Sequence, residues 1–93
     1  MNLTTKHIVV KGKVQGVFFR KHTKKVADEL NIQGWVKNTY EGHVEIIAHG
    51  MEDAMIKLIE WCRQGPPKAD VSDITVKDII ADESFKSFYI YRE

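Results

Sequence analysis

The chain has 93 residues, of which 43% are hydrophobic and 29% charged, a composition typical of a soluble globular protein. This length suits one compact domain, so we expect a single domain over residues 1–93. The net charge of +1, from 14 basic and 13 acidic residues, is too balanced for a dedicated nucleic-acid binder. The N-terminus lacks an apolar signal segment, and no apolar run approaches the ~20 residues of a membrane span. The single cysteine, Cys62, cannot form an internal disulfide. We therefore expect a cytoplasmic protein that binds neither nucleic acid nor a membrane.

The first half of the chain predicts a strand, a helix and a hairpin. Residues 7–14 are rich in β-branched side chains, which favour strands. Residues 19–31 predict a helix, because their apolar side chains recur at three- and four-residue spacing on one face. Residues 34–37 and 43–48 predict two strands joined by a turn at 38–42, since Val44, Ile46 and Ala48 alternate with the residues between them.

The second half predicts a helix followed by two strands. Residues 52–64 again carry apolar side chains at three- and four-residue spacing, and Gly65-Pro66-Pro67 ends the helix. Strands follow at about residues 71–81 and 85–92, with a connection at 82–84. The order β-α-β-β-α-β plus one strand indicates an α+β, ferredoxin-like split β-α-β sandwich, with two helices on one face of a mainly antiparallel sheet. Many unrelated functions use this fold, so it identifies no chemistry by itself.

The segment from Gly12 to Arg20, GKVQGVFFR, joins the first strand to the first helix. Glycines let such a junction turn tightly, and the first amides of a helix have no partners within it. These amides can hold an anion, and an arginine in the first helical turn can add a two-donor fork. The alternative is a plain tight turn with a surface arginine. The motif lacks the Gly-Lys-Ser/Thr of a P-loop.

Asn38 follows the predicted strand that begins at Gly34. Asparagine at a strand end is usually a turn residue that bonds its own backbone. Its carboxamide could instead position a water molecule, because it both donates and accepts hydrogen bonds. The residues alone leave both interpretations open.

Two segments together resemble the signatures of the acylphosphatase family. The first is Gly12-x-Val14-Gln15-Gly16-Val17-x-Phe19-Arg20, and the second is Gly34-Trp35-Val36-Lys37-Asn38 followed by Gly42-x-Val44-Glu45. Gly65-Pro66 and Phe88-x-Ile90 also match. The resemblance extends over nearly the whole chain and implies the same split β-α-β fold.

The resemblance implies an enzyme that hydrolyses the carboxyl–phosphate anhydride of acyl phosphates without metal or cofactor. It makes Arg20 the phosphate ligand and Asn38 the residue that orients the attacking water. The loop would bind phosphate through backbone amides, and Thr39 would support the Asn38 region. The loop residues are Gln15, Gly16, Val17, Phe18 and Phe19. Inorganic phosphate would be product and competitive ligand, and we expect a monomer. The chain ends Tyr91-Arg92-Glu93, whereas many relatives have the arginine before the tyrosine, which puts a C-terminal contact with the site in doubt.

Rival functions find less support in the residues. Five lysines at positions 11, 13, 21, 24 and 25 could steer an anionic substrate or be a solvated face, and they also suggest a nucleic-acid-binding module. No RNP-like aromatic run accompanies them. The four histidines lack HExxH-type spacing, and Cys62 fits a helix core better than a nucleophile. A regulatory domain that keeps the phosphate site without turnover is the third interpretation.

Overall fold

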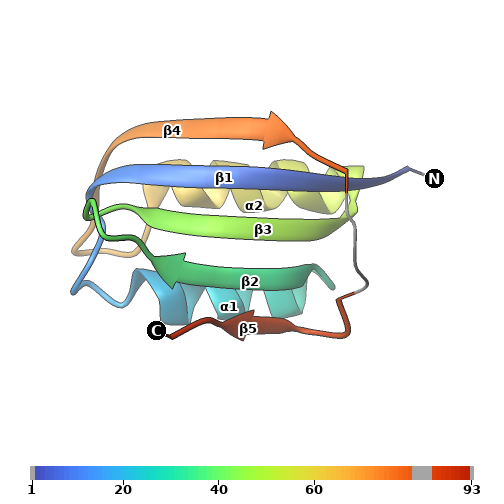
Figure 1. Cartoon of the computed structure of the whole chain (residues 1–93), viewed down its shortest axis with the longest axis horizontal. Coiled ribbons are helices and arrows are strands. Elements are labelled where there is room, and N and C mark those ends of the chain that lie inside the picture. Colours follow the sequence, from blue (N-terminus) through green and yellow to red (C-terminus); the bar gives the residue numbers. More distant parts are fainter. Residues whose placement is uncertain (1, 81–84, 93) are drawn as a thin grey trace.

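A single five-stranded sheet carries two helices on one face (Figure 1). The computed structural model describes residues 2–80 and 85–92. Its strands are β1 (Leu3–Lys13), β2 (Gln33–Asn38), β3 (Val44–Met51), β4 (Asp70–Asp78) and β5 (Phe88–Ile90). Its helices are α1 (Phe19–Glu29) and α2 (Glu52–Gln64). The predicted α+β ferredoxin-like sandwich is confirmed.

The sheet order, β4-β1-β3-β2-β5, was not predictable from the sequence. Each neighbouring pair is antiparallel except β2 and β5, which are parallel. Because β1 and β2 both run antiparallel to β3, they are parallel to each other, and α1 connects them. The same holds for β3 and β4 around β1, with α2 as the connection. Figure 1 shows α1 behind β2 and β5, and α2 behind β1 and β3.

The predicted helix at residues 52–64 matches α2, whereas α1 ends at Glu29 instead of residue 31. The amide of Ile32 donates to the carbonyl of Ala27 at 2.8 Å, and that of Asn31 to Asp28 at 3.2 Å. Asn31 itself has a φ of 58°. This is a Schellman ending, in which asparagine takes the left-handed position usually held by glycine. The apolar periodicity continued through Leu30, so it did not reveal this stop.

The boundaries of all five strands also differ from the prediction. Strand β2 extends one residue further at each end, over Gln33–Asn38, and β3 spans Val44–Met51 rather than 43–48. The first strand begins at Leu3 rather than residue 7, because its polar start pairs with β3, Leu3 opposite Met51. Strand β4 spans Asp70–Asp78 rather than 71–81, and β5 covers Phe88–Ile90 rather than 85–92. The predicted connection at 82–84, like residue 81, lies outside the described residues.

The core lies between the helices and the sheet face that they cover. Val44, Ile46 and Ala48 of β3 are fully buried there, which confirms the predicted alternation. Met55, Leu58 and Cys62 of α2 pack into the same core. In the described part of the chain, neither helix is long and apolar enough to cross a membrane.

Candidate functional site

Three strands have their C-terminal ends along one edge of the sheet, the edge that runs across the strand ends beside the start of α1. Strands β1, β2 and β5 all run in one direction, so their C-terminal ends meet at this edge (Figure 1). The edge therefore gathers the loop after β1, the last residue of β2 and the chain that follows β5. These three segments are far apart in the sequence.

The loop between β1 and α1 turns through two left-handed residues. Gly16 has a φ of 74°, and Phe18, the N-cap of α1, has a φ of 64°. Glycine adopts this conformation freely, whereas an aromatic residue does so at a cost of order 1 kcal/mol. Within residues 2–80 and 85–92, the backbone amides of residues 15–20 donate to no carbonyl or side chain. These amides are available to a ligand, as at the start of any helix.

Buried side chains on either side hold this loop in place. Val14, Val17 and Phe19 are at most 5% exposed. The Phe19 ring lies 5.2 Å from that of Trp61 on α2 and is tilted by 59° to it. By contrast, Phe18 is 67% exposed, so it contributes little to the core. The loop alternates core anchors with residues that face solvent.

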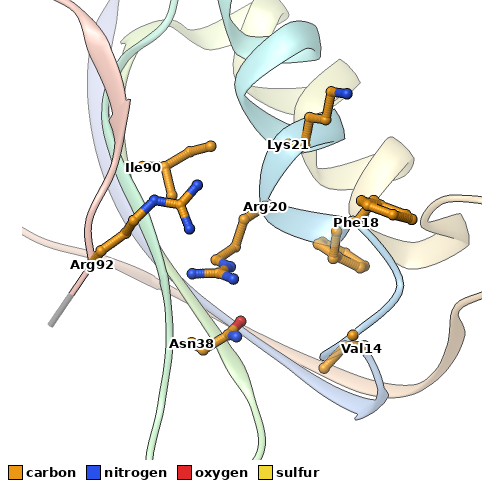
Figure 2. A pocket seen from close by; sticks show the side chains of 9 residues that line it. Val14, Phe18, Arg20, Lys21, Asn38, Ile90 and Arg92 are labelled. Carbon is orange, nitrogen blue, oxygen red and sulfur yellow. The ribbon is translucent and has the colours of Figure 1, made fainter.

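Asn38 and Arg20 lie on the same face of the sheet. Side chains alternate along a strand, so Asn38 shares the helix-covered face with Val36, which is fully buried. Arg20 is the second residue of α1 and reaches over this face. Figure 2 shows the guanidinium of Arg20 and the carboxamide of Asn38 directed toward one another.

A pocket of about 390 Å³ surrounds these two side chains. Its walls come from the loop, the start of α1, the end of β2 and the chain around β5. They are Val14, Gly16, Phe18, Phe19, Arg20, Lys21, Asn38, Ile90 and Arg92. Three of these residues are cationic and none is acidic, so the pocket favours an anion. In Figure 2 the ammonium of Lys21 points away from the two guanidinium groups.

The side chain of Gln15 connects the loop to the turn after Asn38. Its Nε2 donates to the carbonyl oxygens of Thr39 at 2.9 Å and His43 at 2.8 Å. The hydroxyl of Thr39 accepts from the amide of His43 at 3.1 Å, which closes the turn. The carboxylate of Glu41 lies in the same turn. Hydrogen bonds from its own backbone amide and from the Thr39 hydroxyl hold the pKa of Glu41 below its usual value.

Five of the predicted site residues line the pocket and three do not. Gly16, Phe18, Phe19, Arg20 and Asn38 line it. Val17 is a core residue, Gln15 bonds the turn, and Thr39 lines a different hollow on the uncovered sheet face. The roles assigned to all eight in binding and catalysis stay predictions.

Arg92 lines the pocket, although the sequence left a C-terminal contact with the site in doubt. The signal was present in the alternation of the last strand. Phe88 is buried and Ile90 lines the pocket, so Arg92, two residues further, faces the same way. Tyr91 faces the opposite side, where its ring lies 6.0 Å from that of Trp35.

Among residues 2–80 and 85–92, neither the cysteine nor a cluster of metal-ligand side chains makes a second site. Cys62 is fully buried in α2, and burial raises its pKa to about 12, which confirms its interpretation as a core residue. In the described residues, no three His, Cys, Asp or Glu side chains gather as metal ligands would. The five lysines do not form one patch: Lys11 lies on the uncovered sheet face, while Lys24 bonds Asp28 and the carbonyl of Phe88.

Comparison with known proteins identifies the family. The acylphosphatase family model matches residues 6–90. An acylphosphatase from Coxiella burnetii is 46% identical over 82 residues, covering 88% of this chain and 86% of the relative. A solved acylphosphatase structure from the same organism superposes with a TM-score of 0.92 at 44% identity, over 97% of this chain and 94% of that one. The acylphosphatase structure from Bacillus subtilis also gives 0.92, at 38% identity over 98% and 100% of the chains. The chain therefore belongs to the acylphosphatase family.

Proposed function

We propose that this protein hydrolyses the carboxyl–phosphate anhydride bond of acyl phosphates, giving a carboxylate and inorganic phosphate. The names of the matched relatives support acylphosphatase activity. The observation that carries the finer proposal is the joint position of Arg20 and Asn38 in one cationic pocket beside a loop of unpartnered amides. An acyl phosphate is already activated by its carboxylate leaving group. The site therefore needs only to bind the phosphate, to orient the attacking water and to stabilise the charge that builds on the phosphoryl oxygens.

The phosphate is bound by the loop and by Arg20. The amides of residues 15–20 have no acceptor among the described residues, and a dianion can accept from several of them at once. The guanidinium of Arg20 lays two parallel N–H donors on two phosphate oxygens. Because these donors are fixed before substrate arrives, they also stabilise the charge that builds on the phosphoryl oxygens in the transition state.

Asn38 orients the attacking water. Its carboxamide oxygen accepts from the water while its NH₂ group can donate to the phosphate or to the water oxygen. The strand position fixes this group, since Asn38 pairs with Val44 of β3 and the following turn is closed by Thr39. Holding water in line with the scissile bond removes much of the entropy cost of attack.

The reaction balances without a base from the protein. The water oxygen forms a bond to phosphorus, the bond from phosphorus to the acyl oxygen breaks, and the carboxylate leaves with the electron pair. A phosphoryl oxygen of the substrate takes the water's proton. Among the described residues, the pocket lining contains no His, Asp, Glu, Cys or Tyr side chain that could serve as the general base.

Hydrolysis of benzoyl phosphate by wild type, Arg20→Lys and Asn38→Ala, with chelator present, tests this proposal. Arg20→Lys is expected to raise the KM and to lower kcat, because an ammonium cannot reproduce the two-donor fork. Asn38→Ala is expected to bind inorganic phosphate almost normally and to lose about 10²–10³-fold in kcat. Arg63→Gln, which removes an exposed arginine of α2 outside the pocket, is the matched control.

Three outcomes would contradict the proposal. If both variants kept the full rate, the assigned roles would be wrong. If the chelator abolished the wild-type rate, metal-free hydrolysis would be wrong. If wild type bound phosphate but gave no product even in a single turnover, the protein would be a phosphate-binding regulatory domain instead.

A further inference from the structure

We propose that Arg92 makes this enzyme prefer acyl phosphates whose acyl group carries a second negative charge. The inference rests on the proposed function, and it specifies which class of acyl phosphate the same site prefers. It assigns the acyl side of the substrate to a guanidinium that follows the last strand, while Arg20 and the loop keep the phosphate.

The register of the last strand places Arg92 beside Asn38. Ile90 pairs with Val36 in the parallel ladder between β5 and β2, and the amide of Tyr91 donates to the carbonyl of Val36 at 2.8 Å. Asn38 lies two residues after Val36, and Arg92 lies two residues after Ile90. Both side chains therefore project to the helix-covered face at the same level of the sheet.

A second hollow adjoins the pocket on this side. It has a volume of about 360 Å³ and is lined by Arg20, Asn38, Tyr91 and Arg92. It shares Arg20, Asn38 and Arg92 with the first pocket but contains no residue of the loop before α1. A substrate whose phosphate occupies the loop can therefore extend its acyl group into this hollow, against Arg92.

The order of three side chains in Figure 2 suggests where the acyl group would leave in the proposed reaction. The guanidinium of Arg20 lies between the carboxamide of Asn38 and the guanidinium of Arg92 in this view. Water and leaving group must lie on opposite sides of the phosphorus atom. With the phosphate held by Arg20 and the loop, and water held by Asn38, the proposal places the leaving acyl group on the Arg92 side of the phosphorus atom.

The charges leave Arg92 available to the acyl group. Neither Arg20 nor Arg92 has a hydrogen-bond or ion-pair partner among residues 2–80 and 85–92. No acidic residue among those that the structure describes lines either hollow. Two guanidinium groups facing one space repel each other, and a trianionic substrate relieves this repulsion better than a dianionic one. A carboxylate on the acyl group also matches the planar fork of arginine.

The test compares two aromatic acyl phosphates of nearly equal size. In 4-carboxybenzoyl phosphate the para substituent is anionic, and in 4-carbamoylbenzoyl phosphate it is neutral. For wild type at low ionic strength we expect kcat/KM to be about three- to fivefold higher for the carboxylate, the range of an exposed ion pair. The preference should fall in ~0.5 M salt, because exposed charges are screened.

Two variants and one control assign the preference to Arg92. Arg92→Gln should bring the ratio of the two kcat/KM values close to one, with a smaller loss on the neutral substrate. The exchange Tyr91→Arg/Arg92→Tyr keeps the composition and net charge but moves the guanidinium to position 91, which borders the hollow with its side chain turned toward Trp35, and it should reduce the preference. Arg63→Gln removes the same charge outside both hollows and should keep the preference.

The inference is overturned if wild type hydrolyses both substrates without preference, or if the preference persists in Arg92→Gln. It is also overturned if Arg92→Gln slows both substrates equally at an unchanged ratio, because Arg92 would then bind the phosphate. Wild type that hydrolyses neither substrate would instead contradict the proposed function, and this inference with it.

Discussion

The side-chain amide of Gln15 donates a 2.9 Å hydrogen bond to the carbonyl oxygen of Thr39, the residue that follows Asn38. The same Nε2 reaches the carbonyl of His43 at 2.8 Å, on the far side of the turn. One side chain of the proposed phosphate loop thus fixes the turn that carries the proposed water-orienting residue. The binding and water-positioning parts of the site are physically coupled through it.

Gln15→Met should impair catalysis more than phosphate binding. The substitution keeps the length of the side chain but removes both donors, so the turn and Asn38 lose their fixed position. We expect kcat to fall about tenfold, the inhibition constant of inorganic phosphate to change less than about twofold, and stability to fall by about 1–2 kcal/mol. Steady-state kinetics and urea unfolding check these values. Equal losses in kcat and in phosphate affinity would contradict a positioning role.

The apolar pattern of the sequence predicted every element of the fold. It succeeded at α2, where Met55, Leu58 and Cys62 face the core and Gly65 ends the helix. It failed at the end of α1, because Asn31 stops that helix by adopting a left-handed conformation that no hydrophobic period records. The spacing of apolar residues predicts which face of a helix or strand is buried. It predicts less well where a helix ends and the chain reverses direction.

The site was predictable where local sequence determines geometry and unpredictable where strand pairing does. Arg20 and Asn38 follow from two short motifs, and both line the pocket. Arg92 depends on the parallel pairing of β5 with β2, a contact between segments about fifty residues apart. Whether Arg92 or Tyr91 faces the pocket is decided by one residue of register.

The turnover rate should depend little on pH between 6 and 8. Among the described residues, no His, Cys, Asp, Glu or Tyr side chain lines the pocket proposed for the phosphate, so we expect no general base of the protein to act there. We expect kcat at saturating benzoyl phosphate to vary less than about twofold. Because kcat reports on the enzyme–substrate complex, ionisation of free substrate is excluded from this profile. A loss of tenfold or more that follows a single protein ionisation would contradict a base-free mechanism.

Alanine at Gly65 should destabilise the protein more than alanine at Gly16. Gly65 combines a φ of 72° with a ψ of −179°, a region that essentially only glycine occupies. A Cβ there would also lie 3.0 Å from the Phe19 ring, whereas a Cβ at Gly16 would meet nothing within 4 Å. We expect losses of about 2–3 kcal/mol for Gly65→Ala and about 1 kcal/mol for Gly16→Ala, which sits at an ordinary left-handed φ. Urea unfolding measures both, and the reverse order would contradict this assignment.

The thiol of Cys62 should react only when the protein unfolds. Burial raises its pKa from an ordinary value of 9.0 to about 12, so the native protein holds about a thousandfold less thiolate than the unfolded chain at pH 8. Labelling with a chromogenic disulfide at pH 8 should therefore be slow and should accelerate with the unfolded fraction in urea. Rapid labelling in the absence of urea would contradict the burial.

The same shift makes stability depend on alkaline pH. The folded-state pKa is raised above the unfolded one, so the stabilisation from the neutral thiol is complete below pH 9 and is lost as the pH rises toward 12. Within that window the free energy of unfolding should fall by up to about 1.4 kcal/mol per pH unit because of this one group. Cys62→Ala is the matched control: it should be less stable at pH 7, since it leaves a small cavity, yet it should lose less stability between pH 9 and 11. Parallel stability curves for the two proteins above pH 9 would show that the thiol ionises equally in both states.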